Sequence, residues 1–267
     1  EEGDRSPADV FLAQDAGALG AVSKAGLFAD LPDDVLQKVP AAYRANNGHW
    51  VGVTGRSRVL VYNPDLVPES ELPASVFELT EEKWRGKVGI APTNASFQAF
   101  ITAIRVDHGD DRAREFLSGL VANEAQVRDN NVLIVRDVAD GKLAVGLVNH
   151  YYVFGQAKEA GVPVEEYGAK LHFFKDGDTG ALVNVSGVGI LNKAASDPDA
   201  RALVEFLLGT RAQTYFAEQT FEYPVVSGVP TAPGLPELAA LEVPDIDLND
   251  LDTLQETIQM ITDAGLA

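Results

Sequence analysis

The amino-acid sequence predicts an α/β fold, and three observations support this prediction. Short apolar segments alternate along the chain with amphipathic helical segments of about 10–15 residues, a pattern typical of strand–helix–strand units with mainly parallel sheets. Of the 267 residues, 46% are hydrophobic and 23% are charged, the composition of a folded globular protein. No internal repeat or low-complexity tract interrupts the alternation. The length corresponds to one large domain or two medium ones, at roughly 100–200 residues per domain.

The predicted elements follow one another with polar caps at the helix starts and a proline-rich connector at Pro224–Pro236. The first predicted helix begins at Asp15 and ends near Gly26. The predicted strands are the apolar runs Ala8–Leu12, His49–Tyr62, Lys87–Ala91, Lys142–Val148 and Val183–Leu191. The predicted helices are Asp15–Ala29, Thr93–Asp107, Asp111–Ala122, Asp129–Val138, Asn149–Gly161, Asp199–Leu208, Arg211–Gln219 and the tail Asn249–Ala264.

Two strand-rich segments are unusually long. Val51–Tyr62 and Ala181–Leu191 both carry glycine and other small residues near their middles. Such segments can run from one sheet into another and act as a hinge. Two ordinary strands within one sheet explain the same pattern, so both interpretations stay open.

Composition and charge exclude several classes of protein. The chain has 40 Asp and Glu against 21 Lys and Arg, a net charge of −19, which argues against binding to DNA or RNA. It has no cysteine, so thiol catalysis, disulfides and zinc–thiolate sites are excluded. No run of 18 apolar residues is present that would predict a membrane-spanning helix.

Catalytic motifs are missing as well. The sequence contains no phosphate-binding P-loop, no H-E-x-x-H, no G-x-S-x-G and no G-x-G-x-x-G after a strand. Its four histidines show no metal-ligand spacing. We therefore expect no enzyme, although a hydrolase or transferase that uses His150 and neighbouring acids stays an open alternative.

Three polar helix starts each follow a predicted strand directly. They are Thr93–Ser96, Asp129–Asn131 and Asn149–Tyr152. Helix amino ends present free N–H groups and the positive end of the helix dipole, so several that converge form an anion site. Ordinary helix capping explains each of them singly.

The pair Tyr151–Tyr152 is the sharpest local feature. Adjacent side chains diverge on a strand, so both phenols reach one ligand only at a turn or in the first turn of a helix. Two phenolates suit a hard trivalent metal such as Fe(III), whose charge expels the phenol protons. The alternative is that both rings pack a helix onto a sheet.

Several stretches together resemble the ferric-ion-binding proteins, the extracytoplasmic solute-binding subunits of iron ABC importers. They occur in the order of that family and cover nearly the whole chain. They are E-E-G-D-R-S-P-A-D-V-F (1–11), T-G-R-S-R-V-L-V-Y (54–62), P-T-N-A-S-F (92–97), D-N-N-V (129–132), L-V-N-H-Y-Y (147–152), D-T-G-A-L-V (178–183), S-G-V-G-I-L (186–191) and E-Y-P-V (222–225).

The resemblance implies a two-lobed, type II periplasmic-binding-protein fold of the venus-flytrap kind, with two crossover strands at the hinge. The implied amino-terminal lobe is 1–56 and 184–234, and the carboxyl-terminal lobe is 57–183 and 235–267. Fe(III) would be held between the lobes by tyrosinates and completed by a synergistic anion, phosphate or carbonate.

The resemblance also implies the residues of the site. Tyr151 and Tyr152 are the implied metal ligands. Gln14 stands where many members carry a ligand Glu, and a neutral amide oxygen is the weaker donor to Fe(III). Phe97 stands where some relatives carry a third tyrosine. The residues that match the anion-binding loops are Asn94, Ala95, Ser96, Asn130 and Asn149, with Arg56 as a cleft arginine.

The resemblance further implies a monomer that passes iron to an ABC permease of the inner membrane. We expect a periplasmic or otherwise extracytoplasmic location, with a lipid anchor as an option through a leader outside this sequence. Members begin with a further β-α-β unit that often carries a His ligand, so we expect either a truncated piece or a natural short form.

Two more alternatives follow from the same residues. The chain could bind a small oxyanion or organophosphonate without metal, with Tyr151 and Tyr152 stacking on it or hydrogen bonding to it. A shortened form could also fold only in part and bind nothing.

Overall fold

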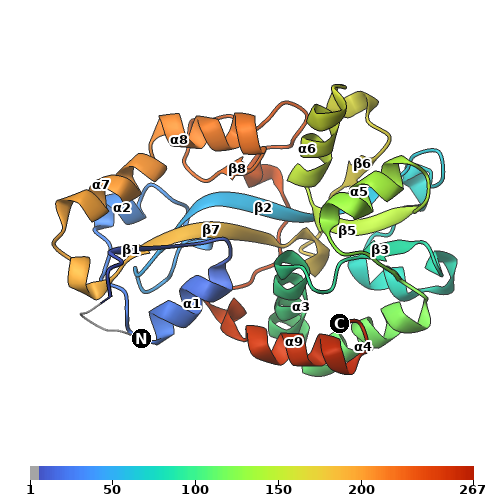
Figure 1. The fold of residues 1–267 in the computed structure, drawn as a ribbon, viewed down its shortest axis with the longest axis horizontal. Coiled ribbons are helices and arrows are strands. Elements are labelled where there is room, and N and C mark those ends of the chain that lie inside the picture. The colour runs from blue at the N-terminus through green and yellow to red at the C-terminus, as the bar shows by residue number, and fades with distance from the viewer. Residues whose placement is uncertain (1–5) are drawn as a thin grey trace. The chain divides into compact units, whose positions relative to one another are not determined.

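The computed structural model describes residues 6–267, which form two compact units (Figure 1). Unit 1 comprises the described residues through Arg56, together with Asn184–Ala239 and Asp247–Asp252. Unit 2 comprises Ser57–Val183, Ala240–Ile246 and Thr253–Ala267. The first five residues of the Glu1–Phe11 stretch, on which part of the family resemblance rests, lie outside the described residues.

Unit 1 is built on a sheet in which β7 lies beside β2 (Figure 1). β1 pairs antiparallel with β7, with Val10 opposite Ile190, and β8 pairs antiparallel with the first half of β2. The elements of unit 1 are β1 (Val10–Ala13), α1 (Ala16–Lys24), α2 (Asp33–Leu36), the first half of β2 (Val51–Tyr62), most of β7 (Val183–Ile190), α7 (Pro198–Leu207), α8 (Thr210–Tyr215) and β8 (Tyr223–Pro224).

A late segment of the chain completes unit 1. The short 3-10 helix η11 (Leu248–Asp252) packs on α1, where two glycines allow the main chains to approach. A Cβ atom on Gly17 would lie 2.4 Å from the Leu251 carbonyl oxygen, and one on Gly20 would lie 2.7 Å from that of Asn249. No side chain larger than hydrogen fits at these positions without a shift of the backbone.

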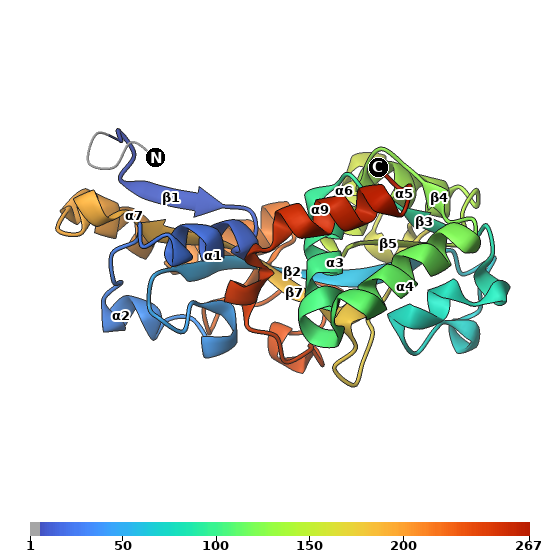
Figure 2. The same ribbon diagram turned by 90° about the horizontal axis from the view of Figure 1, so that it is seen from below.

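Unit 2 is a sheet covered on both faces. Val59 and Val61 join one core cluster, whereas Leu60 and Tyr62 join the other, because alternate side chains of a strand point to opposite faces. Helices α5 and α6 cover the first face, and α3, α4 and α9 cover the second (Figures 1 and 2). The elements are the second half of β2, β3 (Val88–Ile90), α3 (Ala95–His108), α4 (Asp110–Ala122), β4 (Gln126–Val127), α5 (Asn131–Ala139), β5 (Val145–Asn149), α6 (Tyr151–Ala160), β6 (Lys170–His172) and α9 (Leu254–Asp263).

The strand directions correct one prediction. β3 is parallel to β4 and β5, but β2 is antiparallel to β5, β6 and β8, and β1 is antiparallel to β7. The expectation of mainly parallel sheets is therefore wrong. Parallel pairing arises where a helix crosses over between two strands of the same sheet, whereas β2 enters unit 2 directly from unit 1.

Element ends also differ from the predictions. Helix α1 ends at Lys24, which agrees with the predicted end near Gly26 but makes the range to Ala29 too long. The predicted helix Arg211–Gln219 divides into α8 and a π-helical turn at Phe216–Thr220. The predicted tail helix divides into η11, in unit 1, and α9, in unit 2.

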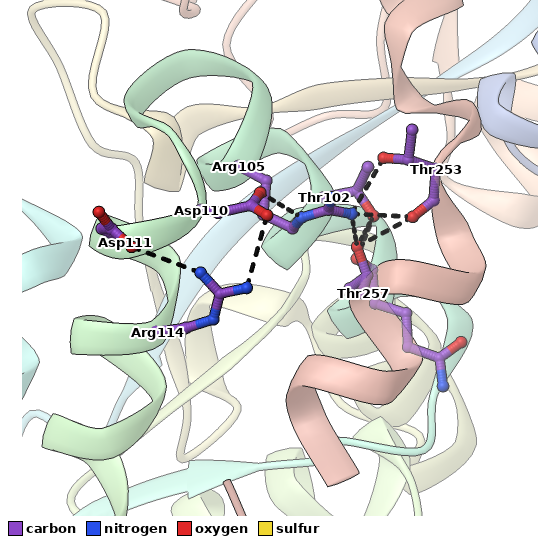
Figure 3. A network of polar contacts seen from close by, with 8 residues as sticks. Thr102, Arg105, Asp110, Asp111, Arg114, Thr253 and Thr257 are labelled. Carbon is purple, nitrogen blue, oxygen red and sulfur yellow. Dashed lines mark hydrogen bonds and ion pairs between the residues drawn. The ribbon is translucent and has the colours of Figure 1, made fainter. Parts of the chain in front are cut away.

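A polar network fixes α9 within unit 2 (Figure 3). Arg105 of α3 donates through Nη1 to the Thr253 carbonyl and to the Thr257 hydroxyl, both at 2.9 Å, and through Nε to Asp110 at 2.9 Å. The hydroxyls of Thr102 and Thr257 lie 2.8 Å apart. Helix α9 consequently packs against α3 through paired polar groups as well as through the core (Figure 2).

Candidate functional site

Three helix starts lie at one edge of the sheet of unit 2. β3 is parallel to both β4 and β5, so the carboxyl ends of these three strands point the same way. Helices α3, α5 and α6 begin soon after β3, β4 and β5 respectively. Ligands of open α/β sheets bind at such an edge.

The tyrosine pair occupies the first turn of α6. β5 ends at Asn149, which is buried and lies opposite Arg58 in the register of β2. Both tyrosine side chains are partly exposed, and their ring centroids lie 4.4 Å apart with an angle of 35° between the planes. The two phenols therefore lie side by side, as binding of one ligand by both requires. Tyr152 also packs on the core cluster beneath α6, so packing accounts for part of its position.

His150 anchors this turn to β2. Its backbone N–H donates to the Ser57 carbonyl at 3.0 Å, and the Ser57 N–H donates to His150 Nδ1 at 3.1 Å. Nδ1 also lies 3.4 Å from the Ser57 carbonyl oxygen, but the shorter contact with an N–H makes Nδ1 the acceptor. The side chain has no exposed surface. This burial argues against the alternative of a hydrolase or transferase that uses His150.

The start of α3 is held by its own side chains. Asn94 is the N-cap, and its Oδ1 accepts hydrogen bonds from the Ser96 N–H at 3.0 Å and from the Ser96 hydroxyl at 2.7 Å. Ala95 is exposed, and its N–H makes no hydrogen bond with another residue of the 6–267 range. This amide is thus available to an anion at the positive end of the α3 dipole.

Two buried side chains that the sequence analysis did not name as individual site residues lie behind this turn, although Asn131 belongs to the predicted polar helix start Asp129–Asn131. Asn131, with no exposed surface, donates through Nδ2 to Asn94 Oδ1 at 3.2 Å and to Ser96 Oγ at 3.0 Å. Arg58, 2% exposed, donates to Ser96 Oγ at 3.2 Å and to the Leu147 carbonyl at 2.9 Å. The only sequence signal for Arg58 is a charged residue inside an apolar strand.

Arg58 is a buried cation close to the tyrosine pair. Burial lowers the pKa of its guanidinium to about 9, although the negative charge of ionised Tyr152 and Tyr151 opposes this shift. Its guanidinium lies over the rings of Phe97 and Phe100, at 5.8 and 5.3 Å from their centroids. These contacts stabilise a charge that stays in place at neutral pH.

The remaining residues predicted for the site, Asn130, Gln14 and Arg56, lie in other parts of the structure. Asn130 is exposed and caps α5, because its Oδ1 accepts from the Leu133 N–H at 2.9 Å. Gln14 and Arg56 belong to unit 1. Gln14 is exposed, and the carboxylate of the next residue, Asp15, is already occupied as the cap of α1.

Arg56 is buried beside an acid of its own unit. Its Nε lies 3.7 Å from Glu222 Oε1, and neither Nε nor Nη2 has a hydrogen-bond partner in the described part of the chain. Glu222 in turn accepts from the hydroxyls of Thr54 and Thr220, at 3.2 and 2.9 Å. Within residues 6–267, no three or more His, Asp or Glu side chains group together in a way that could hold a metal ion.

Comparison with known families identifies the class of protein. Residues 5–250 match the family described as bacterial extracellular solute-binding protein. No helix within residues 6–267 is long and apolar enough to cross a membrane.

Individual relatives narrow this class. The chain is 32% identical to the Fe(3+)-binding periplasmic protein of Serratia marcescens, over all of this chain and 78% of that protein. It is 35% identical to iron-bound HitA from Pseudomonas aeruginosa, with a TM-score of 0.89 over 99% of this chain and 85% of that one. Trichodesmium FutA in complex with iron and citrate is 30% identical, with a TM-score of 0.87 over 100% and 86% of the two chains.

The chain therefore belongs to the periplasmic ferric-ion-binding protein family. Its relatives have the type II periplasmic-binding fold, and its own fold matches theirs. The family and the fold class predicted from the sequence motifs are both confirmed.

Proposed function

We propose that this protein captures Fe(III) as the solute-binding component of an ABC importer, with Tyr151 and Tyr152 as metal ligands and an oxyanion at the helix starts of unit 2. The observation that carries this proposal is the pair of phenol rings side by side in the first turn of α6. The names of the relatives support iron as the solute.

The chemistry of phenols suits this cargo. Phenolate oxygens are hard, anionic donors, and a metal ligand must lose its proton before it binds. A trivalent cation lowers the pKa of a phenol it binds far below the ordinary value of about 10. Iron capture by Tyr151 and Tyr152 therefore releases protons, and no catalytic step is needed.

The oxyanion would complete the coordination of the metal and balance its charge. The exposed N–H of Ala95 and the dipole of α3 offer the anion hydrogen bonds and positive potential. Asn94, Ser96 and Asn149 lie at the same edge of the sheet. Phosphate or carbonate fits this role, and one structural relative holds iron together with citrate.

The remaining assignments stay proposals. Arg56 and Gln14 are carried over from the family resemblance, Gln14 as a weak neutral donor. Asn130 is carried over as well, but we expect it to contribute little to anion binding, because its Oδ1 caps α5. A monomer in the periplasm or another extracytoplasmic space would deliver its iron to an inner-membrane permease. Release would follow loss of the anion or protonation of the phenolates.

The test is a visible-absorption titration with ferric nitrilotriacetate in the presence of phosphate or hydrogencarbonate. Fe(III) tyrosinate gives a charge-transfer band, and we expect it to saturate at about one iron per chain. Tyr151→Phe and Tyr152→Phe should each weaken iron binding by a factor of about 100 or more, because each removes one anionic ligand.

Tyr215→Phe is the matched control, since Tyr215 is 58% exposed and lies on α8 of unit 1. It should leave the band unchanged. A wild-type chain that stays colourless but binds phosphate would replace this proposal with the alternative of an oxyanion-binding protein. A band that survives both tyrosine substitutions would place the metal elsewhere.

A further inference from the structure

Arg58 differs from the other half-buried or buried arginines of unit 2. Arg128 is paired with Asp137 at 2.7 Å, and Arg105 is paired with Asp110 at 2.9 Å. Arg58 is more deeply buried than either, yet it forms no ion pair with an Asp or Glu of the described chain. Its partners are a hydroxyl, a carbonyl and two aromatic rings, and its Nε has no partner there.

A buried charge without a counter-charge opposes folding, because it loses its hydration and gains no full negative partner. The neighbouring positions of β2 are filled by the apolar Val59, Leu60 and Val61. A cation at position 58 therefore favours a negative charge close to it.

The hydrogen bonds around Ser96 indicate the first turn of α3 as the place where a negative charge would bind. Ser96 Oγ accepts from Arg58 and from Asn131, so its own proton is directed to Asn94 Oδ1. In the same turn, the N–H of Ala95 makes no hydrogen bond within residues 6–267. Asn131 Oδ1 is buried without a partner within residues 6–267, which is a second sign of incomplete pairing beneath this turn.

We propose that Arg58 is a positioning residue for the oxyanion: from beneath the first turn of α3 it fixes the Ser96 hydroxyl and supplies the positive charge against which the anion binds. The anion contacts the turn and not Arg58 itself, since Arg58 is buried. This inference rests on the anion-binding part of the proposed function. It assigns the electrostatic contribution to a residue that the family resemblance did not select.

The experiment measures the phosphate concentration that gives half of the maximal tyrosinate–iron band at fixed ferric nitrilotriacetate. We expect Arg58→Met to raise this concentration at least tenfold, because it keeps an unbranched side chain but removes the charge. Arg58→Lys should recover part of the loss. Arg85→Met is the matched control, since it removes the same charge from an exposed arginine of unit 2 that is paired with Glu82 and Glu124, and it should change the value less than twofold.

A second variant, Asn131→Asp, tests the same proposal if Arg58→Met does not fold. Asn131→Asp leaves Arg58 in place but sets a carboxylate beside Ser96, which neutralises the cation, and it should also raise the required phosphate at least tenfold. Circular dichroism and thermal unfolding establish that each variant is folded. An unchanged phosphate dependence in a folded Arg58→Met or Asn131→Asp overturns the proposal.

Calorimetric titration of the iron-free chain with inorganic phosphate separates this inference from the proposed function. If the wild type shows no iron band but binds phosphate, and Arg58→Met binds it at least tenfold more weakly, iron capture fails and the role of Arg58 stands. If Arg58→Met binds phosphate as tightly as the wild type, the role of Arg58 fails. If the wild type binds phosphate neither with iron nor without it, the role of Arg58 fails, and the iron titration with hydrogencarbonate decides separately on iron capture.

Discussion

The starts of α3 and α5 have the same sequence signal but different surroundings. Both helices follow a strand and begin at an asparagine whose Oδ1 accepts from a backbone N–H of the first turn. At α5, the capping residue Asn130 is exposed, and its side chain accepts a hydrogen bond from the Leu133 N–H of its own helix. At α3, Asn94 is joined to Asn131, Ser96 and the buried Arg58. We therefore propose that a capping residue belongs to a binding site only when polar or charged groups lie behind it, as at α3.

The largest expected effect is on stability, and it comes from a substitution in α3 far from the start of that helix. Arg105→Met removes the bonds to Thr253 and Thr257 and the ion pair with Asp110 (Figure 3). Because Arg105 is only 10% exposed, we expect a loss of about 2–3 kcal/mol in the free energy of unfolding. Urea unfolding followed by circular dichroism measures it.

Arg114→Met is the control for this loss. Its ion pairs with Asp110 and Asp111 are at the surface, so it should cost less than about 1 kcal/mol. The phosphate dependence of iron binding should stay unchanged in both variants. A tenfold shift in Arg105→Met would mean that the whole of α3, and not its first turn, determines anion binding.

The direct test compares the two capping asparagines. Asn94→Ala should raise the phosphate needed for half of the iron band about tenfold, because it breaks the network that orients Ser96. Asn130→Ala should change it less than twofold, although each substitution also removes a cap worth about 1 kcal/mol of stability. An equal loss of phosphate binding in the two variants would make Asn130 an anion-binding residue and abolish the distinction.

The smallest effect concerns pH. Burial lowers the pKa of His172 in β6, whose Nε2 contacts the Pro73 carbonyl oxygen at 2.9 Å. The unfolded chain therefore binds the proton more readily than the folded one. Stability is present above the ordinary histidine pKa of about 6.5 and declines as the pH falls below it.

Thermal unfolding between pH 7.5 and pH 5 tests this decline. His172→Gln keeps a hydrogen-bond donor without a titrating group, so its melting temperature should fall less over that range than that of the wild type. Identical pH profiles would exclude His172 as a source of the decline. His172→Gln should leave phosphate binding at the start of α3 unchanged.

The sequence predicted the family, the fold class and the position of Tyr151 and Tyr152 at a helix start for a common reason. Each rests on a local motif, and the turn that places Tyr151 beside Tyr152 is determined by residues next to it in the chain. The support of α3 rests on contacts between distant residues, such as Arg58 with Ser96 and Asn131 with Asn94. The hydrophobic periodicity of a single sequence does not show which polar residues meet across a sheet. An isolated arginine in an apolar strand likewise gives no information about its hydrogen-bond partners.

The strand directions and the tail illustrate the same limit. Alternation of strands and helices predicts parallel pairing only when a helix connects the strands, and β2 has no such connection to β5. The tail has a helical pattern throughout, but Thr253 begins a separate helix because the preceding residues pack on α1. Tertiary contacts overrode local propensity at that point.

The contact of η11 with α1 has a consequence for the order of folding. Gly17 and Gly20, near the beginning of the chain, leave room for the main chain of Leu251 and Asn249, near its end. During synthesis, unit 1 therefore stays incomplete until residues 247–252 have been made. Contacts between such distant residues slow folding, since a long loop must close before they form. Within the described residues α1 is the first helix of unit 1 in sequence, yet its packing against η11 can form only once residues 248–252 have been made.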